Sequence, residues 1–247
     1  MRSQEPREFR SYEAVLHFRH YQYHVLDAAR DVAIEALREA VQRDPEYALA
    51  WAMLSETTAD AYGLRIDTNP NVFGVAKEQA RRALSLDPEC QHAHWSMAYA
   101  HFHARERKQV IREAEEAIAL NPNNGYLAGI SAWAMALVGE WDHGLSMLRR
   151  IMESNPHYPT WFHLAPYLKH YQSNDFERAL FHAEKFNSLL ACDLILRGAA
   201  LVQVVRRDDA RVAIDDLKAR FPNAAAQPAH YVRGYIFIED IVEEVVD

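Results

Sequence analysis

The sequence predicts an all-α protein, a right-handed α-solenoid of about six helical hairpins with a C-terminal capping segment. The first observation is a fixed period, because Pro88, Pro122 and Pro156 follow one another at intervals of 34 residues. The second is a recurring set of mostly small side chains twelve, eight and five positions before each proline. These sets are Ala76, Ala80 and Ala83, then Val110, Ala114 and Ala117, then Gly144, Leu148 and Ile151. Hairpins with this pattern bury their apolar faces only by stacking.

Two further prolines extend the pattern toward both ends of the chain. Pro45 follows Ala33, Leu37 and Ala40 at the same offsets, and Pro222 follows Ala210, Ile214 and Leu217. We therefore expect one solenoid domain over 1–247. Its predicted hairpins cover 10–45, 46–88, 89–122, 123–156, 157–189 and 190–222, and its cap covers 223–247.

Each hairpin is expected to contain two helices that end at defined residues. Small side chains let the two helices approach closely, and the proline ends the second one because it lacks an N–H and disfavours helical geometry before it. The expected helices are 12–23 and 29–43, one from 51 and one from about 72, 92–102 and 107–120, 126–137 and 141–153, 158–171 and 176–188, 192–205 and 208–221, and then 229–236 and 238–246.

Three places depart from a uniform repeat. Pro45 and Pro88 are 43 residues apart, so nine surplus residues are expected in a loop near 62–71, and such insertions often lie on a binding face. Gly139 is expected to end a helix, and Asn174 or Asp175 to cap the next one. Pro166 falls inside a predicted helix and should kink it or break a hydrogen bond there.

Composition restricts the function. The net charge of −8 argues against a nucleic-acid surface. Cys90 and Cys192 have no metal or redox spacing and are expected to be reduced structural thiols. The N-terminal residues lack the apolar core of a signal peptide, and no apolar run approaches membrane-spanning length. We therefore expect a cytoplasmic protein without a cofactor.

The proline-phased pattern resembles the tetratricopeptide repeat (TPR). In TPR proteins, the first helix of each hairpin faces a concave groove that binds a peptide or protein partner. Transferred to this sequence, the resemblance predicts an aromatic and histidine-lined groove. Its partner-binding residues are expected to be His92, Trp95, Tyr99, Phe102, His103, Tyr126, Trp133, His163, Tyr167 and Tyr171. The alternative for each is packing against the neighbouring hairpin. None is the Lys, Arg or Asn with which TPR co-chaperones grip an acidic C-terminus, so that ligand class is disfavoured.

A narrower resemblance covers most of the chain. The stretch 12–33, followed by Asp-Pro-Glu-Tyr-Ala-Leu-Ala-Trp at 44–51, resembles the opening of TPR regions in bacterial signalling proteins. The nine surplus residues of the second hairpin, and Phe221-Pro222 leading into an acidic helical tail, resemble the same family. There such regions follow a winged-helix, nucleotide cyclase or kinase domain. The resemblance implies a regulatory or sensing role exerted by protein contact. Whether the chain is a fragment of such a regulator or stands alone is left open.

Thirteen histidines suggest an alternative function as a metal or small-molecule sensor. His17, His20 and His24 share one helical face, and His163 and His170 share another. No zinc spacing, phosphate loop or nucleophile motif accompanies them, so we expect neither a metal site nor an enzyme.

The C-terminal segment carries more apolar residues than one buried helix face needs. Tyr231, Tyr235 and Ile238 can cover the last hairpin, which leaves Ile236 and Phe237 pointing elsewhere. The sequence thus predicts a homodimer through this segment, with a bent cap that buries both faces as the alternative.

Overall fold

The structure is a computed structural model that describes residues 9–24, 27–64, 69, 71–187 and 190–246. The described residues form helices and turns, without strands. The first eight helices are α1 (Phe9–His24), α2 (Asp27–Arg43), α3 (Ala48–Gly63), α4 (Asn71–Leu86), α5 (Gln91–His103), α6 (Arg107–Leu120), α7 (Gly125–Leu137) and α8 (Trp141–Ser154). The others are the 3₁₀ helix η2 (Thr160–His163), α9 (Leu164–Gln172), α10 (Phe176–Ala183), α11 (Ala191–Gln203), α12 (Arg207–Arg220), α13 (Pro222–Ala226), α14 (Pro228–Val232) and α15 (Glu239–Val246).

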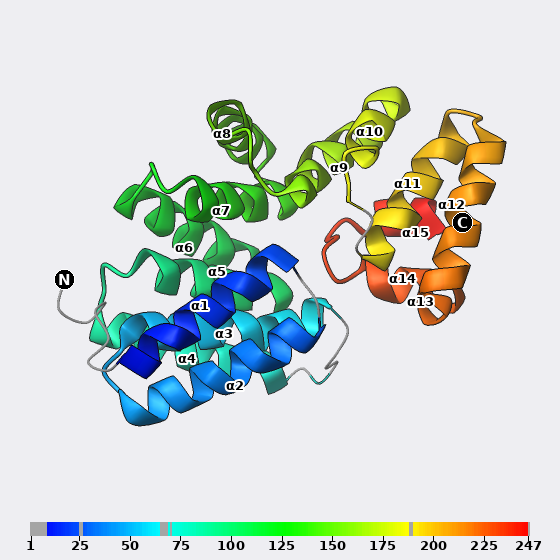
Figure 1. The fold of residues 1–247 in the computed structure, drawn as a ribbon. Coiled ribbons are helices and arrows are strands. Elements are labelled where there is room, and N and C mark those ends of the chain that lie inside the picture. Colours follow the sequence, from blue (N-terminus) through cyan, green and yellow to red (C-terminus); the bar gives the residue numbers. More distant parts are fainter. Residues whose placement is uncertain (1–8, 25–26, 65–68, 70, 188–189, 247) are drawn as a thin grey trace. The chain divides into compact units, whose positions relative to one another are not determined.

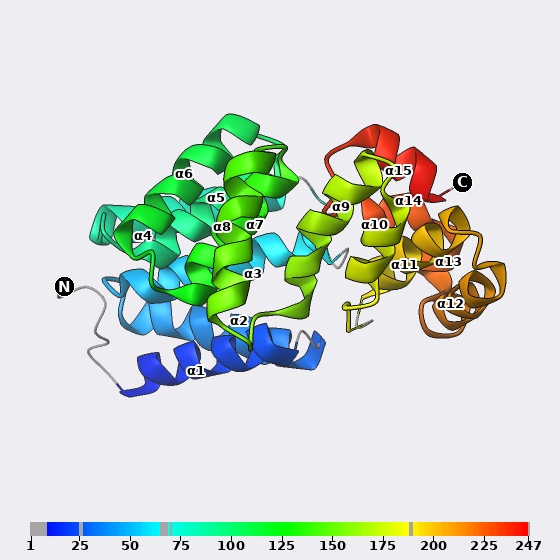
Figure 2. The same ribbon diagram turned by 90° about the horizontal axis from the view of Figure 1, so that it is seen from above.

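The contacts group the chain into two units, Met1–Ala134 and Met135–Asp247. In the first unit the hairpins α1–α2, α3–α4 and α5–α6 stack in chain order (Figures 1 and 2). In the second unit α9 packs with α10 and α11 packs with α12, and α14 and α15 both pack against α11. A single solenoid domain over 1–247 stays a prediction.

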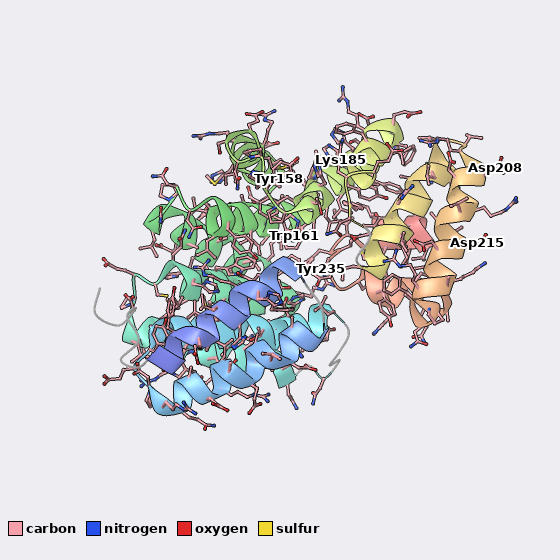
Figure 3. The ribbon with its side chains drawn as sticks, in the orientation of Figure 1. Tyr158, Trp161, Lys185, Asp208, Asp215 and Tyr235 are labelled. Carbon is pink, nitrogen blue, oxygen red and sulfur yellow. The ribbon has the colours of Figure 1, made fainter. Side chains whose placement is uncertain are left out.

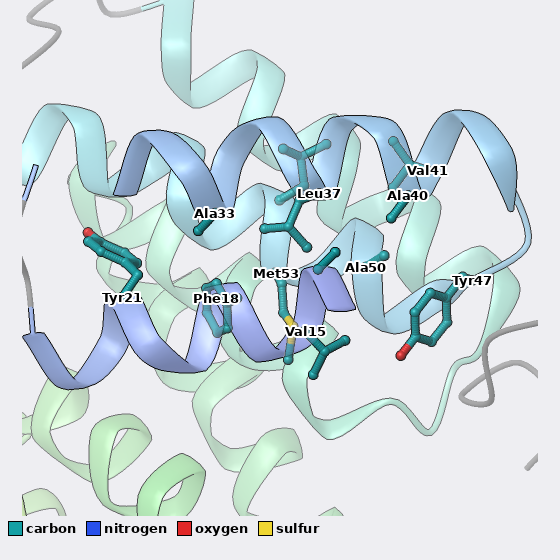
Figure 4. Packing of buried hydrophobic residues seen from close by; sticks show 12 residues of the cluster. Val15, Phe18, Tyr21, Ala33, Leu37, Ala40, Val41, Tyr47, Ala50 and Met53 are labelled. Carbon is teal, nitrogen blue, oxygen red and sulfur yellow. The ribbon is translucent and has the colours of Figure 1, made fainter. Parts of the chain in front are cut away.

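The small residues of the repeat lie at the helix contacts. Ala33, Leu37 and Ala40 point from α2 toward the cluster that α1 and α3 complete (Figure 4). The corresponding Ala76 and Ala83 of α4 are fully buried. Because these side chains are short, the helix backbones can approach closely and exclude water along the seam. The last hairpin differs, because Ile214, which lies eight residues before Pro222 as Leu37 does before Pro45, is 40% exposed.

The turns inside four hairpins need a left-handed residue. Gly139 has φ 91°, and Arg105, Asn174 and Val205 have φ of 63°, 58° and 64°. Gly139 follows α7 as predicted, and its N–H donates to the carbonyl of Ala136 at 2.9 Å. Glycine adopts this geometry without a Cβ clash, whereas a β-branched residue such as Val205 is strained.

The fifth hairpin differs from the predicted helix over 158–171. A 3₁₀ turn, η2, precedes α9, so the α-helix begins at Leu164. Pro166 then lies in its first turn, where a backbone N–H has no partner within the helix. The proline therefore removes no hydrogen bond within α9, and the predicted kink stays a prediction. The carboxylate of Asp175 caps α10 as predicted, accepting from the N–H of Arg178 at 3.4 Å.

The second helix of this hairpin and the C-terminal segment are also shorter than expected. α10 ends at Ala183, although the pattern predicts a helix to 188. α14 ends at Val232, and a turn carries the chain to α15. Ile236 is 1% exposed in this bent cap, so the expectation that it points elsewhere is wrong. Phe237 is half-buried. The homodimer stays a prediction, now resting on fewer exposed apolar groups.

Several smaller expectations have clear outcomes. The helix predicted from about Val72 begins at Asn71, and most of the inserted loop before it lies outside the described residues. Cys90 and Cys192 are both free and buried, and burial raises the pKa of the Cys90 thiol to about 11. Among the helices that the structure describes, none combines the length and the apolar character needed to cross a bilayer.

Replacing Val205 by glycine should stabilise the protein. The Val205 side chain is 74% exposed, so its removal costs little packing, and glycine relieves the left-handed strain. We expect Val205→Gly to raise the free energy of unfolding by about 0.5–1 kcal/mol in urea denaturation. As a control, Val202→Gly in the last turn of α11 should lower it by about 0.5 kcal/mol, because glycine is the poorer helix former. Equal losses in both variants would contradict the assigned turn geometry.

Candidate functional site: a polar network on α1, α3 and α5

A buried carboxylate joins the first helices of three hairpins. Asp60 of α3 accepts a hydrogen bond from the hydroxyl of Tyr21 on α1 at 2.8 Å and another from the hydroxyl of Tyr99 on α5 at 2.6 Å. Each carboxylate oxygen therefore has one tyrosine donor. Because the two donors come from opposite neighbours, Asp60 fixes the spacing of three successive hairpins.

A second carboxylate repeats this arrangement one helical turn earlier on α3. Glu56 accepts from Nε2 of Gln22 on α1 at 3.2 Å, and its other oxygen lies 2.7 Å from Nε2 of His92 on α5. Beside it, the guanidinium of Arg30 on α2 donates to the carbonyl of Thr57 at 3.4 Å. We call Tyr21, Gln22, Glu56, Asp60, His92 and Tyr99 the polar network.

The surroundings of Asp60 raise the pKa of its carboxyl group. The residue keeps some exposed surface, but protein atoms surround its carboxylate. Loss of hydration, together with the charge of Glu56, raises its pKa to about 6, although the hydrogen bonds from Tyr99 and Tyr21 oppose the change. Asp60 therefore changes charge close to neutral pH.

The predicted partner-binding residues of the first unit include two members of this network, His92 and Tyr99, and are mostly buried. His92, Trp95, Tyr99, Phe102, His103 and Trp133 are all buried, and Tyr126 is half-buried. Trp95 stacks on Tyr99 at 5.1 Å between ring centroids, and Phe102 stacks on Trp133 at 5.8 Å. These rings therefore pack against neighbouring helices, which is the alternative that the sequence left open. Direct contact of these residues with a partner stays a prediction.

In the second unit, the three predicted residues are also buried. Tyr167 donates to the carbonyl of Leu196 at 2.8 Å, and Tyr171 accepts from Gln203 at 3.5 Å. His163 belongs to a different group, a histidine pair, because its Nδ1 lies 2.8 Å from Nδ1 of His182. Nothing in these contacts separates a binding role from a packing role.

The histidine pair is held in its neutral form. Burial, with a smaller contribution from the charge of Lys185, lowers the pKa of His163 to about 4. Burial, with smaller contributions from His163 and His170, lowers the pKa of His182 to about 4. Tyr158 lies 3.1 Å from the outer nitrogen of His163; Figure 3 labels both Tyr158 and Lys185. At this distance the Nδ1–H of one ring donates a hydrogen bond to the unprotonated Nδ1 of the other ring. Protonating that second Nδ1 would place two N–H groups against each other, so the pair favours the neutral form.

Other histidines make contacts with carboxylates. Nδ1 of His94 lies 2.8 Å from Glu113, a contact that raises the pKa of His94, and His101 contacts Glu106. Across the described part of the chain, no group of three or more His, Cys, Asp or Glu side chains has the arrangement of a metal site. The side chain of His24 lies outside that part.

Sequence reasoning identified two members of the polar network, His92 and Tyr99, and missed the others. A usable signal was present in α3, where Glu56 and Asp60 stand four residues apart within an otherwise uncharged helix. That spacing places both carboxylates on one face, and a helix covered on several sides must pair such groups.

Comparisons with known proteins add evidence on the fold. No protein-family model and no curated protein matches the chain. The structure of PilW, a widely conserved type IV pilus biogenesis factor, is 17% identical, with a TM-score of 0.59 over 87% of this chain and 95% of its own. Pseudomonas aeruginosa PilF is 17% identical, with a TM-score of 0.55 over 92% of this chain and 98% of its own.

A tetratricopeptide repeat protein from Parabacteroides merdae aligns with 97% of this chain and 98% of its own, at 12% identity and a TM-score of 0.50. The chain has a tetratricopeptide-repeat fold. At these identities the similarity concerns the fold, and the TPR solenoid predicted from the phased prolines is confirmed.

Replacing Asp60 by asparagine should change how stability depends on pH. With a folded pKa of about 6 against an ordinary 3.8, Asp60 favours folding fully below pH 3.8, and this contribution is lost as pH rises through about 6. Asparagine stays neutral. Relative to wild type, Asp60→Asn should therefore gain about 1–3 kcal/mol in free energy of unfolding between about pH 4 and pH 8.

Chemical denaturation across that pH range measures the difference. Glu78→Gln removes an exposed carboxylate from α4 of the same unit and should give a nearly constant difference. A difference for Asp60→Asn that is equally flat would contradict the assigned environment of Asp60.

Proposed function

We propose that this protein is a non-catalytic interaction module that binds a protein or peptide along the first helices of its hairpins. The observation that carries the proposal is the polar network, which ties α1, α3 and α5 together through side chains of α3. A face whose helices are fixed in this way is ordered before binding, so little conformational entropy is lost when a partner docks. The TPR fold supports the same interpretation.

Within this face we propose different tasks for exposed and buried residues. Tyr126, half-buried at the start of α7, is the member of the predicted set best placed to contact a partner directly. Trp95, Phe102 and Trp133 lie beneath the surface and hold its shape. Tyrosine suits the contact role because a large, rigid side chain is immobilised at low entropic cost.

The finer assignment concerns the biological setting. The resemblance of 12–33 and 44–51 to TPR regions of bacterial signalling proteins supports a regulatory or sensing role in the cytoplasm. A net charge of −8 supports a protein partner in preference to a nucleic acid, whose phosphates would be repelled.

Peptide selection tests the proposal without knowledge of the natural partner. A phage-displayed library of random peptides is panned on the purified protein, and the enriched sequences are synthesised for fluorescence anisotropy. Tyr126→Ala should weaken their binding about tenfold or more, because it removes a contact residue. Val75→Ala, which shortens an exposed side chain on α4, should leave affinity unchanged. Failure to enrich any peptide, or equal effects of the two variants, would contradict a binding face on the first helices.

A further inference from the structure

The first hairpin has a groove that no residue of the polar network lines. The α1–α2 groove is a hollow of about 380 Å³ between the two helices. Its lining residues are Glu13, Ala14, His17, Val32, Glu35, Ala36, Glu39, Ala40 and Arg43. Ala14 and Ala40 belong both to this lining and to the hydrophobic cluster beneath it, whereas Phe18 and Tyr21 of α1 belong to the cluster and not to the lining.

The same place is filled in the next two hairpins. In the second, the indole N–H of Trp51 donates to the carbonyl of Pro45 at 3.1 Å. In the third, Nε2 of His94 lies 3.1 Å from the carbonyl of Pro88. These side chains are equivalent, because each reaches the proline that closes the preceding hairpin. His94 also meets Glu113 across the hairpin, so this position carries a large group joined to the second helix.

In the first hairpin, the side chains at the equivalent positions do not fill the space between the two helices. His17 precedes Pro45 by 28 residues, as His94 precedes Pro122, and Ala36 precedes Pro45 by nine residues, as Glu113 precedes Pro122. Alanine replaces the side chain that closes the third hairpin, and His17 is exposed. The α1–α2 groove is therefore the place that a tryptophan or a histidine–glutamate pair occupies in the neighbouring hairpins.

The surroundings of the groove are apolar at its base and acidic at its edge. Its apolar lining residues are Ala14, Val32, Ala36 and Ala40, and the side chain of Val32 is 51% exposed. The lining holds three glutamates, Glu13, Glu35 and Glu39, and one arginine, Arg43. Glu39 pairs with Arg43 at 3.0 Å, and Glu35 pairs with Arg38 at the more distant 3.7 Å. This surface attracts a basic ligand with an apolar group to bury.

We propose that the α1–α2 groove binds a basic segment of a partner protein that inserts one large aromatic side chain between α1 and α2. The ring would take the place that Trp51 has in the second hairpin, and flanking lysines or arginines would meet Glu13, Glu35 and Glu39. A second copy of this chain fits less well, because a two-fold contact would bring the same three glutamates of each copy together.

Synthetic peptides of about ten residues provide the probe. The first carries one tryptophan between lysines, the second has alanine in place of tryptophan, and the third has glutamates in place of the lysines. By isothermal titration calorimetry, the first should bind about tenfold or more tightly than either of the others, because it alone supplies both the ring and the charge. Equal binding of the first two peptides, or no binding of the first, overturns the proposal.

Two protein variants locate the site. Ala36→Glu rebuilds the pair seen between His94 and Glu113, so it should keep the protein folded, fill the groove and reduce peptide affinity about tenfold or more. Glu35→Lys should weaken the peptide through charge alone. Glu78→Lys is its matched control, since Glu78 and Glu35 both stand ten residues before a repeat proline and both pair with an arginine three residues later.

The outcomes separate peptide binding in the groove from general charge attraction and from self-association. Affinity that falls equally in Glu35→Lys and Glu78→Lys would show attraction to the overall negative charge and overturn the site. A doubled mass in light scattering that Ala36→Glu restores to the monomer would assign the groove to a second copy and overturn the proposed partner. Peptides selected for the first-helix face should bind Ala36→Glu normally, so failure of this proposal leaves the proposed function untouched.

Discussion

Close approach of helices at small side chains is the constraint on which the rest of the structure depends. Ala33 and Ala40 in the first hairpin, and Ala76 and Ala83 in the second, are buried where two or three helices meet. A side chain near the size of alanine leaves room for the backbones to pack, and every hairpin then buries its apolar face against its neighbour. Only with this spacing can a carboxylate on α3 reach tyrosines on both α1 and α5.

The polar network follows from the same packing. When three first helices lie side by side, the middle one has little contact with water, and polar groups on it need partners from both sides. Asp60 and Glu56 obtain them from Tyr21, Gln22, His92 and Tyr99. The network therefore connects three successive hairpins through side chains of α3, and the pKa of Asp60, raised to about 6, makes the charge within it depend on pH.

The architecture could be predicted from the sequence because the residues that mark each repeat act locally. Proline position, small residues at fixed offsets and a glycine such as Gly139 each act within one hairpin, so they could be recognised without a structure. Burial of the face residues could not, because whether Trp95 or Tyr167 lies at the surface depends on neighbouring hairpins. The same holds for Ile236, which a bent cap covers, and for Pro166, whose effect depended on where α9 begins. Among the network residues, Asp60 was missed because its partners come from helices on either side of its own.

The repeat also shows how one scaffold acquires different surfaces. Trp51, His94 and His17 occupy corresponding places in three hairpins, and the first two are anchored to the preceding proline carbonyl. A glutamate at 113 completes the third hairpin, whereas an alanine at 36 leaves the first one hollow. A change of one side chain, with the helix contacts kept, thus converts a packed position into an exposed groove.

The most direct test of this account is the stability of Ala83→Leu. Ala83 is fully buried in a cluster formed with Ala52, Cys90 and Ala93, where α3, α4 and α5 meet. A larger side chain there should separate the helices and lower the free energy of unfolding by about 1–3 kcal/mol in urea denaturation. Ala119→Leu on the exposed side of α6 should change it by less than about 0.5 kcal/mol. An Ala83→Leu protein as stable as wild type would contradict the claim that close helix approach holds the hairpins together.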